Sequence, residues 1–382
     1  MTGTKVDIVG AGMAGLAAAL AFSRAGWTVR LRERAEEIRE VGAGLQLSPN
    51  CTHILHALGL GPALDKVMHR PDRIVLASGI TLDTITHVPA GTAAEQRWKS
   101  PYGVIHRADL QKLLFQAAEN TPTISIETGS RIEPGDLGES DADLVVIADG
   151  VWSANRRRLK HAGSPSFTGL VAWRMMVGAQ TAVSFIDPHN VTAFMGPESH
   201  LVAYPVKGGA KVSMVAITTG EDPGADWSYA TSTDNRARLF ERFARWHPTL
   251  RMTMRDADSV TYWPLYQMSD GAYFDGGKTV LIGDAAHAMV PFAAQGAAMA
   301  IEDAWELASA AHEGRTAIFR WEERRRARVA RARKRAAFNR FAYHARGPAR
   351  LARDVVLSLR KPEDLAADLD WLYSWRATGL DA

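Results

Sequence analysis

A glycine-rich turn directly after an N-terminal strand is the feature that most constrains the fold of this chain. The mostly apolar run 6–9 leads into the pattern Gly-x-Gly-x-x-Gly at Gly10, Gly12 and Gly15, and residues 13–25 have the Ala- and Leu-rich character of a helix. In such a unit the first glycine permits a tight turn, the second lets the backbone approach a pyrophosphate, and the third lets the helix pack on the strand. The pattern predicts a dinucleotide site in a Rossmann-like α/β unit.

An acidic residue closes this unit. A second strand is predicted over residues 28–32, and Glu33 follows it, 18 residues after Gly15. An acid at that spacing meets ribose hydroxyls and argues against a ribose 2′-phosphate, while the helix N-terminus favours the phosphates. We therefore expect FAD or NAD rather than NADP here, with Ala14 and Arg34 among the contacts. A glycine-rich turn without a ligand is the alternative.

Length and composition set the class of protein. The chain has 382 residues, enough for two domains, and its 46% hydrophobic and 23% charged residues are those of an ordinary globular protein. No apolar run approaches the roughly 20 residues of a membrane span, and the chain opens on a core strand rather than a signal peptide. The single cysteine, Cys51, allows no intramolecular disulfide or cysteine metal cluster, and we expect it to be buried. We expect a cytoplasmic monomer or homodimer without a metal site.

A second glycine motif lies 268 residues after the first. Gly283 and Asp284 follow the apolar run 279–282, and the continuous apolar run 144–148, typical of a buried parallel strand, ends at Asp149. Between the two motifs the pattern alternates, as in an antiparallel sheet. The predicted division is a discontinuous FAD-binding domain over 1–168 and 277–320, an inserted antiparallel-sheet substrate domain over 169–276, and a helical C-terminal region over 321–382.

The segment 320–350 is strongly basic. It holds twelve Lys or Arg residues against two acids, with Ala327, Ala330, Ala337 and Phe341 at near-helical spacing. This pattern predicts a helix with one packed face and one basic, solvated face. Attraction of an anionic nicotinamide cofactor or acidic substrate is a second interpretation, and contact with an anionic membrane is a third; no nucleic acid partner is expected.

Further motifs carry a family resemblance. They are, in chain order, residues 42–50, His106-Arg107, Asp149-Gly150 with Arg156, residues 172–174, residues 283–287 and residues 291–304. In order and spacing they resemble the single-component FAD-dependent aromatic hydroxylases of the salicylate and 3-hydroxybenzoate hydroxylase type. The resemblance covers essentially the whole chain, and it is specific for the family but much less so for the substrate.

The resemblance implies roles around the flavin. Asp284 would hold a ribityl hydroxyl of FAD, although an acid capping the following helix needs the same geometry. Gly296 and Ala297 would offer backbone N–H groups to the flavin pyrimidine oxygen at a helix start, where negative charge is stabilised. Pro291 would lie beside the isoalloxazine ring.

The nicotinamide co-substrate is implied as well. Arg107 would reach the FAD phosphates, and Asp149 would serve both FAD and the nicotinamide cofactor. No second Gly-x-Gly-x-x-Gly follows a later strand, in keeping with a family that lacks a separate nicotinamide domain. The implied reaction uses NADH or NADPH to reduce FAD, and O2 then gives a flavin hydroperoxide that hydroxylates a small phenolic or N-heteroaromatic ring. A larger apolar substrate, such as a quinone precursor, and a non-catalytic binding protein of the same fold are the alternatives.

A histidine and a tyrosine are candidate substrate contacts. Residues four apart in a strand share a face, so His200 and Tyr204 would point the same way, and related hydroxylases show a His-x-x-x-Tyr pair at the matching place. A phenol attacks better as phenolate, and an unperturbed histidine titrates near neutrality. We therefore interpret His200 as the base; a surface histidine in the turn 196–199, with Tyr204 in the core, is the alternative.

Other positions refine the substrate site. Gln295 could hydrogen-bond a ring substituent and is a second catalytic candidate. Gln46, placed with the substrate contacts, stands where hydroxypyridine-type relatives carry histidine, which argues against 6-hydroxynicotinate. Ala288 replaces a proline usual in the family, and His287 is interpreted as structural. A carboxylate-bearing substrate would call for an arginine in the pocket, and Arg174 is a candidate whose direction the sequence does not give.

Overall fold

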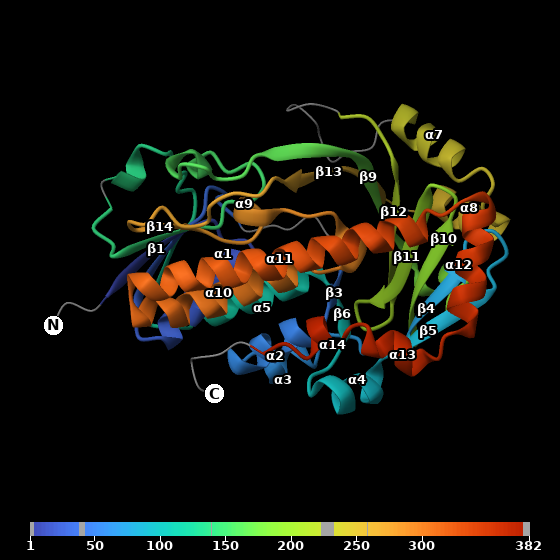
Figure 1. Cartoon of the computed structure of the whole chain (residues 1–382), viewed down its shortest axis with the longest axis horizontal. Coiled ribbons are helices and arrows are strands. Elements are labelled where there is room, and N and C mark those ends of the chain that lie inside the picture. The colour runs from blue at the N-terminus through green and yellow to red at the C-terminus, as the bar shows by residue number, and fades with distance from the viewer. Residues whose placement is uncertain (1–3, 38–42, 139, 223–232, 258, 377–382) are drawn as a thin grey trace.

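Two large sheets covered by helices, together with a small sheet of two strands, make up the described part of the protein. The computed structural model describes residues 4–37, 43–138, 140–222, 233–257 and 259–376, so the stretch 42–50 quoted above begins outside the described part, at Gly42. The first sheet is parallel and five-stranded, with the strand order β14-β8-β1-β2-β7, and it lies on the left in Figure 1. Its strands are β1 (Lys5–Val9), β2 (Thr28–Arg32), β7 (Ile124–Glu127), β8 (Leu144–Ile147) and β14 (Thr279–Leu281).

The order of this sheet brings the two glycine motifs together. Strand β8 lies between β1 and β14, all three run parallel, and α1 (Met13–Arg24) follows β1. The carboxyl ends of parallel strands meet at one edge, where ligands of open α/β sheets bind. Gly10, Asp149 and Gly283 follow these three strands and therefore share that edge.

The second sheet has seven strands in the order β13-β9-β12-β11-β10-β4-β5. They are β4 (Arg73–Ser78), β5 (Thr84–Pro89), β9 (Pro165–Gly178), β10 (Asn190–Gly196), β11 (Ser199–Val206), β12 (Lys211–Thr219) and β13 (Ser259–Met268). All neighbours are antiparallel except β10 and β4. The sheet is thus mixed, and it takes two strands from the range 1–168 that the sequence assigned wholly to the nucleotide unit, because hairpin β4–β5 pairs along its edge.

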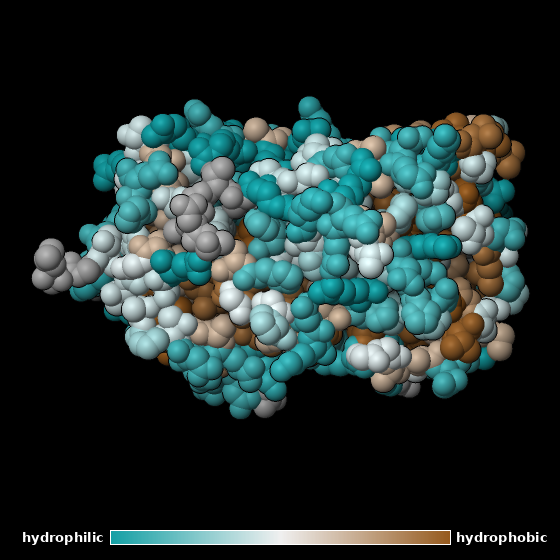
Figure 2. Space-filling view, turned by 90° about the horizontal axis from the view of Figure 1, so that it is seen from below, coloured by the Kyte–Doolittle hydropathy of each residue, from teal (hydrophilic) through white to brown (hydrophobic). Residues whose placement is uncertain are grey.

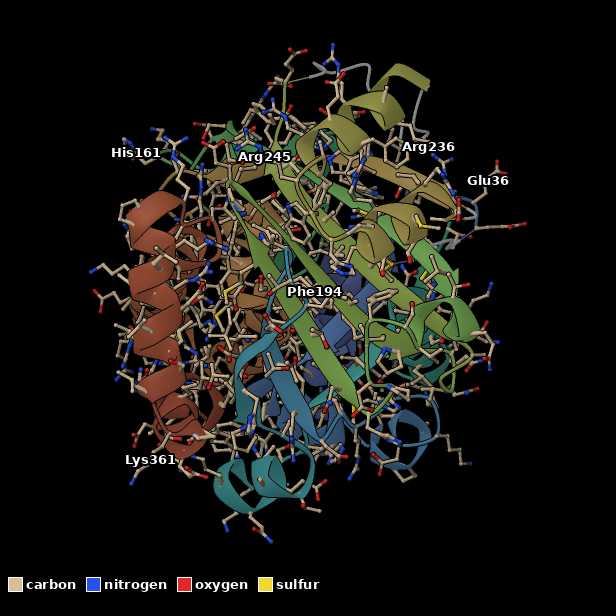
Figure 3. The ribbon with its side chains drawn as sticks, turned by 90° about the vertical axis from the view of Figure 1, so that its right-hand side faces the viewer. Glu36, His161, Phe194, Arg236, Arg245 and Lys361 are labelled. Atoms are coloured by element: carbon tan, nitrogen blue, oxygen red, sulfur yellow. The ribbon has the colours of Figure 1, made fainter. Side chains whose placement is uncertain are left out.

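Alternation along β11 gives the second sheet two different faces. Leu201 and Ala203 point into the core that contains Phe194, beside α7 (Thr233–Arg242) and α8 (Pro248–Arg255). His200 and Val202 point the other way, toward the C-terminal helices. Figure 3 shows α12 (Gly347–Leu359), which ends near Lys361, beside the sheet and opposite the segments that carry Arg236 and Arg245.

The remaining elements connect or cover the sheets. They are β3 (Gly44–Leu47), which pairs with β6 (Gly103–His106), and the helices α2 (Pro49–Ala57), α3 (Gly61–Leu64), α4 (Gly91–Trp98), α5 (Arg107–Glu119), α6 (Ala179–Ala182), α9 (Asp284–His287), α10 (Gly296–Glu313), α11 (Arg315–Tyr343), α13 (Pro362–Ala367) and α14 (Asp370–Tyr373), with short 3-10 turns at Asp136–Gly138, Asn155–Arg158 and Pro291–Ala293. Within the described ranges, no helix is both long and apolar enough to cross a bilayer.

Helix α11 runs from the first sheet to the second and is the longest element in Figure 1. The packed face expected from Ala327, Ala337 and Phe341 is wrong, because all three are exposed. The buried side chains are instead Trp321, Glu322, Arg325, Val329, Ala332 and Ala336. The spacing of apolar residues did not predict the buried face of α11, because that face includes a charged residue.

That residue, Arg325, pairs with carboxylates of α10. Its side chain is fully buried and donates to Glu302 at 2.6 Å and to Asp303 at 2.7 Å. Arg328 also donates to Glu302, at 2.6 Å. Burial alone would raise the pKa of Asp303, but His287 and Arg325 outweigh burial and hold that pKa below its usual value. Part of the basic segment therefore cross-links helices rather than facing solvent.

We expect Arg325→Ala to lower the free energy of unfolding by about 3–5 kcal/mol, because it removes the buried cation that Glu302 and Asp303 share. The control Arg326→Ala removes an exposed arginine from the same helix and should change stability by less than about 0.5 kcal/mol. Urea unfolding followed by tryptophan fluorescence measures both. Equal losses in the two variants would contradict the assignment.

Candidate active site

The N-terminal glycine turn has the geometry of a phosphate cradle. Gly10 has φ +99°, and a Cβ there would lie 2.7 Å from the carbonyl oxygen of Ala148. A Cβ on Gly15 would lie 1.8 Å from the carbonyl oxygen of Gly10, which explains why α1 packs so closely on β1. Gly12 caps α1, and apart from its chain neighbours no heavy atom of the described residues lies within 4 Å of a Cβ built on it. The helix N-terminus is therefore open to a ligand.

Glu33 supports this turn directly. Its Oε2 accepts a hydrogen bond from the backbone N–H of Ala11 at 2.7 Å, and its Oε1 accepts one from Ala35 at 3.0 Å. The carboxylate therefore orders the glycine turn besides standing at the end of β2, where a ribose is expected. Arg34, the next residue, is exposed, and Ala14 is buried in α1.

The second glycine motif lies against the first. Gly283 has φ +59°, and a Cβ there would lie 2.9 Å from the Cβ of Ala14 and 3.2 Å from that of Ala300. Only glycine permits this approach of the β14 turn to α1 and α10. The next residue, Asp284, is exposed at the first position of α9, and the Gly283 N–H donates to buried Asp303 at 2.9 Å.

The turn after β8 completes this edge of the sheet. Asp149 accepts a hydrogen bond from Asn155 on Oδ2 at 3.0 Å, while its Oδ1 is buried without a partner among the described residues. Arg156 donates from Nε to the carbonyl of Ala285 and from NH2 to that of Val151, both at 2.8 Å. Arg156 thus ties the β8 turn to the Asp284 turn, a structural role that sequence reasoning did not separate from binding.

Helix α10 begins beside this edge. Gly296 and Ala297, half-buried, form its first turn, and apart from its chain neighbours and the backbone of α10 no atom of the described chain lies within 4 Å of a Cβ built on Gly296. Arg107 is half-buried at the start of α5, and its backbone N–H donates to Ala43. Pro291 opens the short turn that precedes α10. The helix N-terminus and the open glycine suit a negatively polarised ring oxygen.

The structure places Gln295 off the cavity wall. Its side chain is 1% exposed, its Nε2 donates to Ser48 at 3.0 Å, and its Oε1 accepts from Asn50 at 3.2 Å. One donor position and one acceptor position of the amide are thus engaged by protein groups. Gln295 joins α10 to the start of α2, and its role toward a substrate stays a prediction.

A cavity of about 490 Å³ opens between the second sheet, the turn that carries Pro291, and the C-terminal helices. Its wall is mostly apolar. The polar or charged side chains on it are Gln46, His200, Arg335, Asn339, Tyr343, Arg360, Asp368 and Tyr373. Of the predicted substrate and catalytic residues, the structure brings Gln46, His200 and Pro291 to this wall.

Two expected contacts lie elsewhere. Tyr204 shares the face of His200 but is not part of the cavity wall: its ring packs where a Cβ on Gly44 would come within 2.3 Å of it. Burial raises the pKa of Tyr204 to about 12. Arg174 lies over the ring of Trp263 at 4.5 Å and is likewise not among the cavity residues.

His200 is paired with a second histidine. It is 2% exposed, and its Nδ1 lies 2.8 Å from Nε2 of His344, the residue that caps α11. Burial, and then the neighbouring imidazole, hold the pKa of His200 well below its usual value. Burial also lowers the pKa of His344, to about 4. Both rings are therefore neutral near pH 7, and the pair contains one donor and one acceptor.

Sequence reasoning missed Arg335 as a cavity residue and His344 as the partner of the cavity residue His200. Both lie in or just after the basic helix, and the partner of His344 is 144 residues away in the sequence. No local signal could have connected them. His287 and Cys51 behave as expected: His287 is buried and hydrogen-bonded to Asp303, and Cys51 is buried with a raised thiol pKa. Within the described ranges, no cluster of His, Cys, Asp or Glu could hold a metal.

Comparison with known proteins identifies this arrangement. The family model described as "FAD binding domain" matches residues 3–336. The chain is 31% identical to 3-hydroxybenzoate 6-hydroxylase 1 of Aquipseudomonas alcaligenes over 97% of each chain. It is 34% identical to 3-amino-4-hydroxybenzoate 2-monooxygenase of Streptomyces cremeus over 98% of this chain and 96% of that one. The fold matches a salicylate hydroxylase substrate complex with a TM-score of 0.79 at 22% identity, covering 98% and 96% of the two chains.

The fold, and the sheet edge that carries the turns of Gly10, Asp149 and Gly283, define a flavin-binding oxidoreductase. The chain belongs to the family of FAD-binding monooxygenases. It is an FAD-dependent aromatic hydroxylase that uses NADH or NADPH and acts on a small phenolic or heteroaromatic compound. The open glycines and the unpartnered Asp149 Oδ1 fit FAD at this edge.

We expect Asp284→Ala to weaken FAD binding about 10- to 100-fold, the loss of one hydrogen bond to a charged group. Because Asp284 is exposed, the melting temperature of the apoprotein should not change. Flavin retained after gel filtration, quantified by absorbance, measures the effect. Asp83→Ala, which removes an exposed carboxylate elsewhere, is the control. Stoichiometric flavin in the Asp284 variant would refute the assigned role.

Proposed function

We propose that this hydroxylase binds its aromatic substrate in the cavity below the C-terminal helices and deprotonates the ring hydroxyl with His200. The pairing of His200 with His344 carries this proposal. His200 is the only imidazole on the described cavity wall, and its second nitrogen is engaged by His344. A buried base that hands a proton to a second base suits deprotonation of a phenol away from water.

The protonation states support the direction of transfer. When His200 donates from Nδ1 to His344, its Nε2 is an acceptor. Proton uptake at Nε2 can then be coupled to release of the Nδ1 proton to His344. His344 is half-buried at the end of α11, so a proton that it receives can pass on to solvent. The pair therefore offers a path for the proton out of the cavity.

The chain also offers the groups that would hold the cofactor. Gly12 and the N-terminus of α1 would bind the pyrophosphate, Glu33 a ribose, and Asp284 the ribityl chain. Gly296, at the N-terminus of α10, would stabilise negative charge on the pyrimidine side of the ring. Bound FAD supplies the hydride acceptor and the centre that activates oxygen. The remaining task of the protein is to orient the substrate and exclude water.

Relatives point to the kind of substrate. The two curated relatives named above act on 3-hydroxybenzoate and on 3-amino-4-hydroxybenzoate. Gln46 lies on the cavity wall and accepts a hydrogen bond from Tyr102 at 2.7 Å, which orients its amide toward a ring substituent. We propose a small phenol of this kind as the substrate.

A larger apolar substrate is the second candidate. The cavity of about 490 Å³ lies within the 300–1,000 Å³ typical of sites for drug-sized ligands. Val356 of α12 lines the cavity and is 57% exposed, and Leu359 of the same helix is 79% exposed. Figure 2 shows apolar surface gathered at this end of the molecule. The apolar wall and the exposed apolar side chains of α12 are the observations that support this second candidate.

Substrate-stimulated oxidation of NADH or NADPH tests the proposed function. The FAD-loaded enzyme is assayed with hydroxybenzoates, hydroxypyridines and quinone precursors, and released peroxide is quantified alongside. We expect a hydroxybenzoate to accelerate oxidation with little peroxide, since oxygen is then transferred to the ring. Coupled turnover of quinone precursors alone would favour the second candidate. Stimulation with full peroxide release by every compound would contradict both.

We expect His200→Asn to retain FAD and to lower turnover about 10²- to 10⁴-fold, the usual contribution of a general base. The loss should be greatest at pH 6, where phenolate is scarce. The wild-type enzyme should keep its activity there, because a base with a lowered pKa stays deprotonated as pH falls below 6.5. His161→Asn, at an exposed position with φ +64° that asparagine tolerates, is the control. An unchanged pH–rate profile would remove His200 from the mechanism.

A further inference from the structure

One charge on the cavity wall has no counterpart. Arg335 is half-buried on α11 and lines the cavity. Its Nε is buried, and within the described part of the chain no hydrogen bond or ion pair engages it. Its guanidinium carbon lies 5.7 Å from the ring centroid of Phe338, which is a weak contact. A guanidinium held against an apolar wall is costly unless an anion accompanies it.

The other charges on the wall neutralise each other. Besides Arg335, the charged residues that line the cavity are Arg360 and Asp368. Arg360 donates from NH1 to Oδ2 of Asp368 at 2.5 Å, and it is the first cause of the lowered pKa of that carboxyl. Arg335 acts on Asp368 only at longer range. Two cations and one anion leave a net charge of +1 on the wall, and the unpaired charge is that of Arg335.

We propose that Arg335 binds the carboxylate of an aromatic acid substrate. This inference rests on the proposed function, since it concerns the ligand of the same cavity. A guanidinium offers two parallel N–H donors that match a carboxylate. Arg335 comes from α11, and His200 comes from β11 on the sheet below. The substrate therefore carries a carboxylate toward the helix and a hydroxyl toward the sheet.

The residue that the sequence suggested for this role does not compete. Arg174 packs on Trp263 and is absent from the cavity wall. Binding of the carboxylate is assigned instead to Arg335 of the basic helix. Attraction of an acidic substrate was one interpretation of segment 320–350, and it now rests on this single side chain.

Binding of matched acids and amides tests the inference without turnover. The probes are 2-, 3- and 4-hydroxybenzoate and the three corresponding hydroxybenzamides. Dissociation constants are measured with the FAD-loaded, oxidised enzyme by equilibrium dialysis, in the absence of NADH and NADPH. We expect at least one acid to bind more tightly than its amide. Arg335→Met should weaken that acid about 10- to 100-fold, as expected for a lost hydrogen bond to a charged group, and leave its amide unchanged.

Two further variants make the result specific. Arg335→Lys keeps the charge and should retain part of the preference for the acid. Lys334→Met removes an exposed charge from the neighbouring position and should change neither affinity. Melting temperature and flavin content report folding of each variant.

Three outcomes would overturn the inference. They are equal affinity of the wild-type enzyme for acids and amides, including no binding of either; equal losses for acid and amide in Arg335→Met; and the same loss in Lys334→Met. Coupled turnover of a phenol together with any of these outcomes would leave the proposed function intact. Failure of all phenols in the oxidation assay would count against the proposed function itself.

Discussion

The buried guanidinium of Arg325 is the interaction on which the rest of the structure depends. It pairs with Glu302 and Asp303 of α10. Asp303 in turn accepts the backbone N–H of Gly283, and Glu302 accepts from Asn50 at 2.6 Å. One cation thus fixes the turn after β14, the first half of α10 and the first turn of α2. All three surround the edge where the cofactor is expected to bind.

The same helix that carries Arg325 also covers the substrate cavity. Helix α11 has 29 residues, about 44 Å at 1.5 Å per residue. Arg325 anchors it over α10, and its far end reaches the second sheet, where Asn339 donates to the carbonyl of Phe292 at 2.9 Å. Arg335 and His344 are carried on this stretch. A rigid helix held at both ends can hold Arg335 at the cavity and His344 against His200 more precisely than a loop can.

Several residues lie off the cavity wall for a shared reason. Gln295 and Tyr204 have the residue types and spacing of substrate contacts, but Gln295 hydrogen-bonds Ser48 and Asn50, and Tyr204 fills space beside Gly44. Hairpin β4–β5 joined the second sheet although it lies within the first 168 residues. A local sequence pattern predicts which face of its own strand or helix a side chain lies on. It does not predict which residues of another element pack against that side chain.

The sequence by itself determined the nucleotide edge, because a strand, three glycines and Glu33 define a local geometry that needs few distant partners. It also determined that His200 shares a face with Tyr204, since alternation is a property of the strand. Only the tertiary structure decided that Arg325 is buried, that His200 meets His344 across 144 residues, and that Arg335 faces the cavity. Those three facts depend on how helices pack on sheets. Side chains that pair between distant segments produce no periodic pattern in a single sequence, so the sequence alone does not predict them.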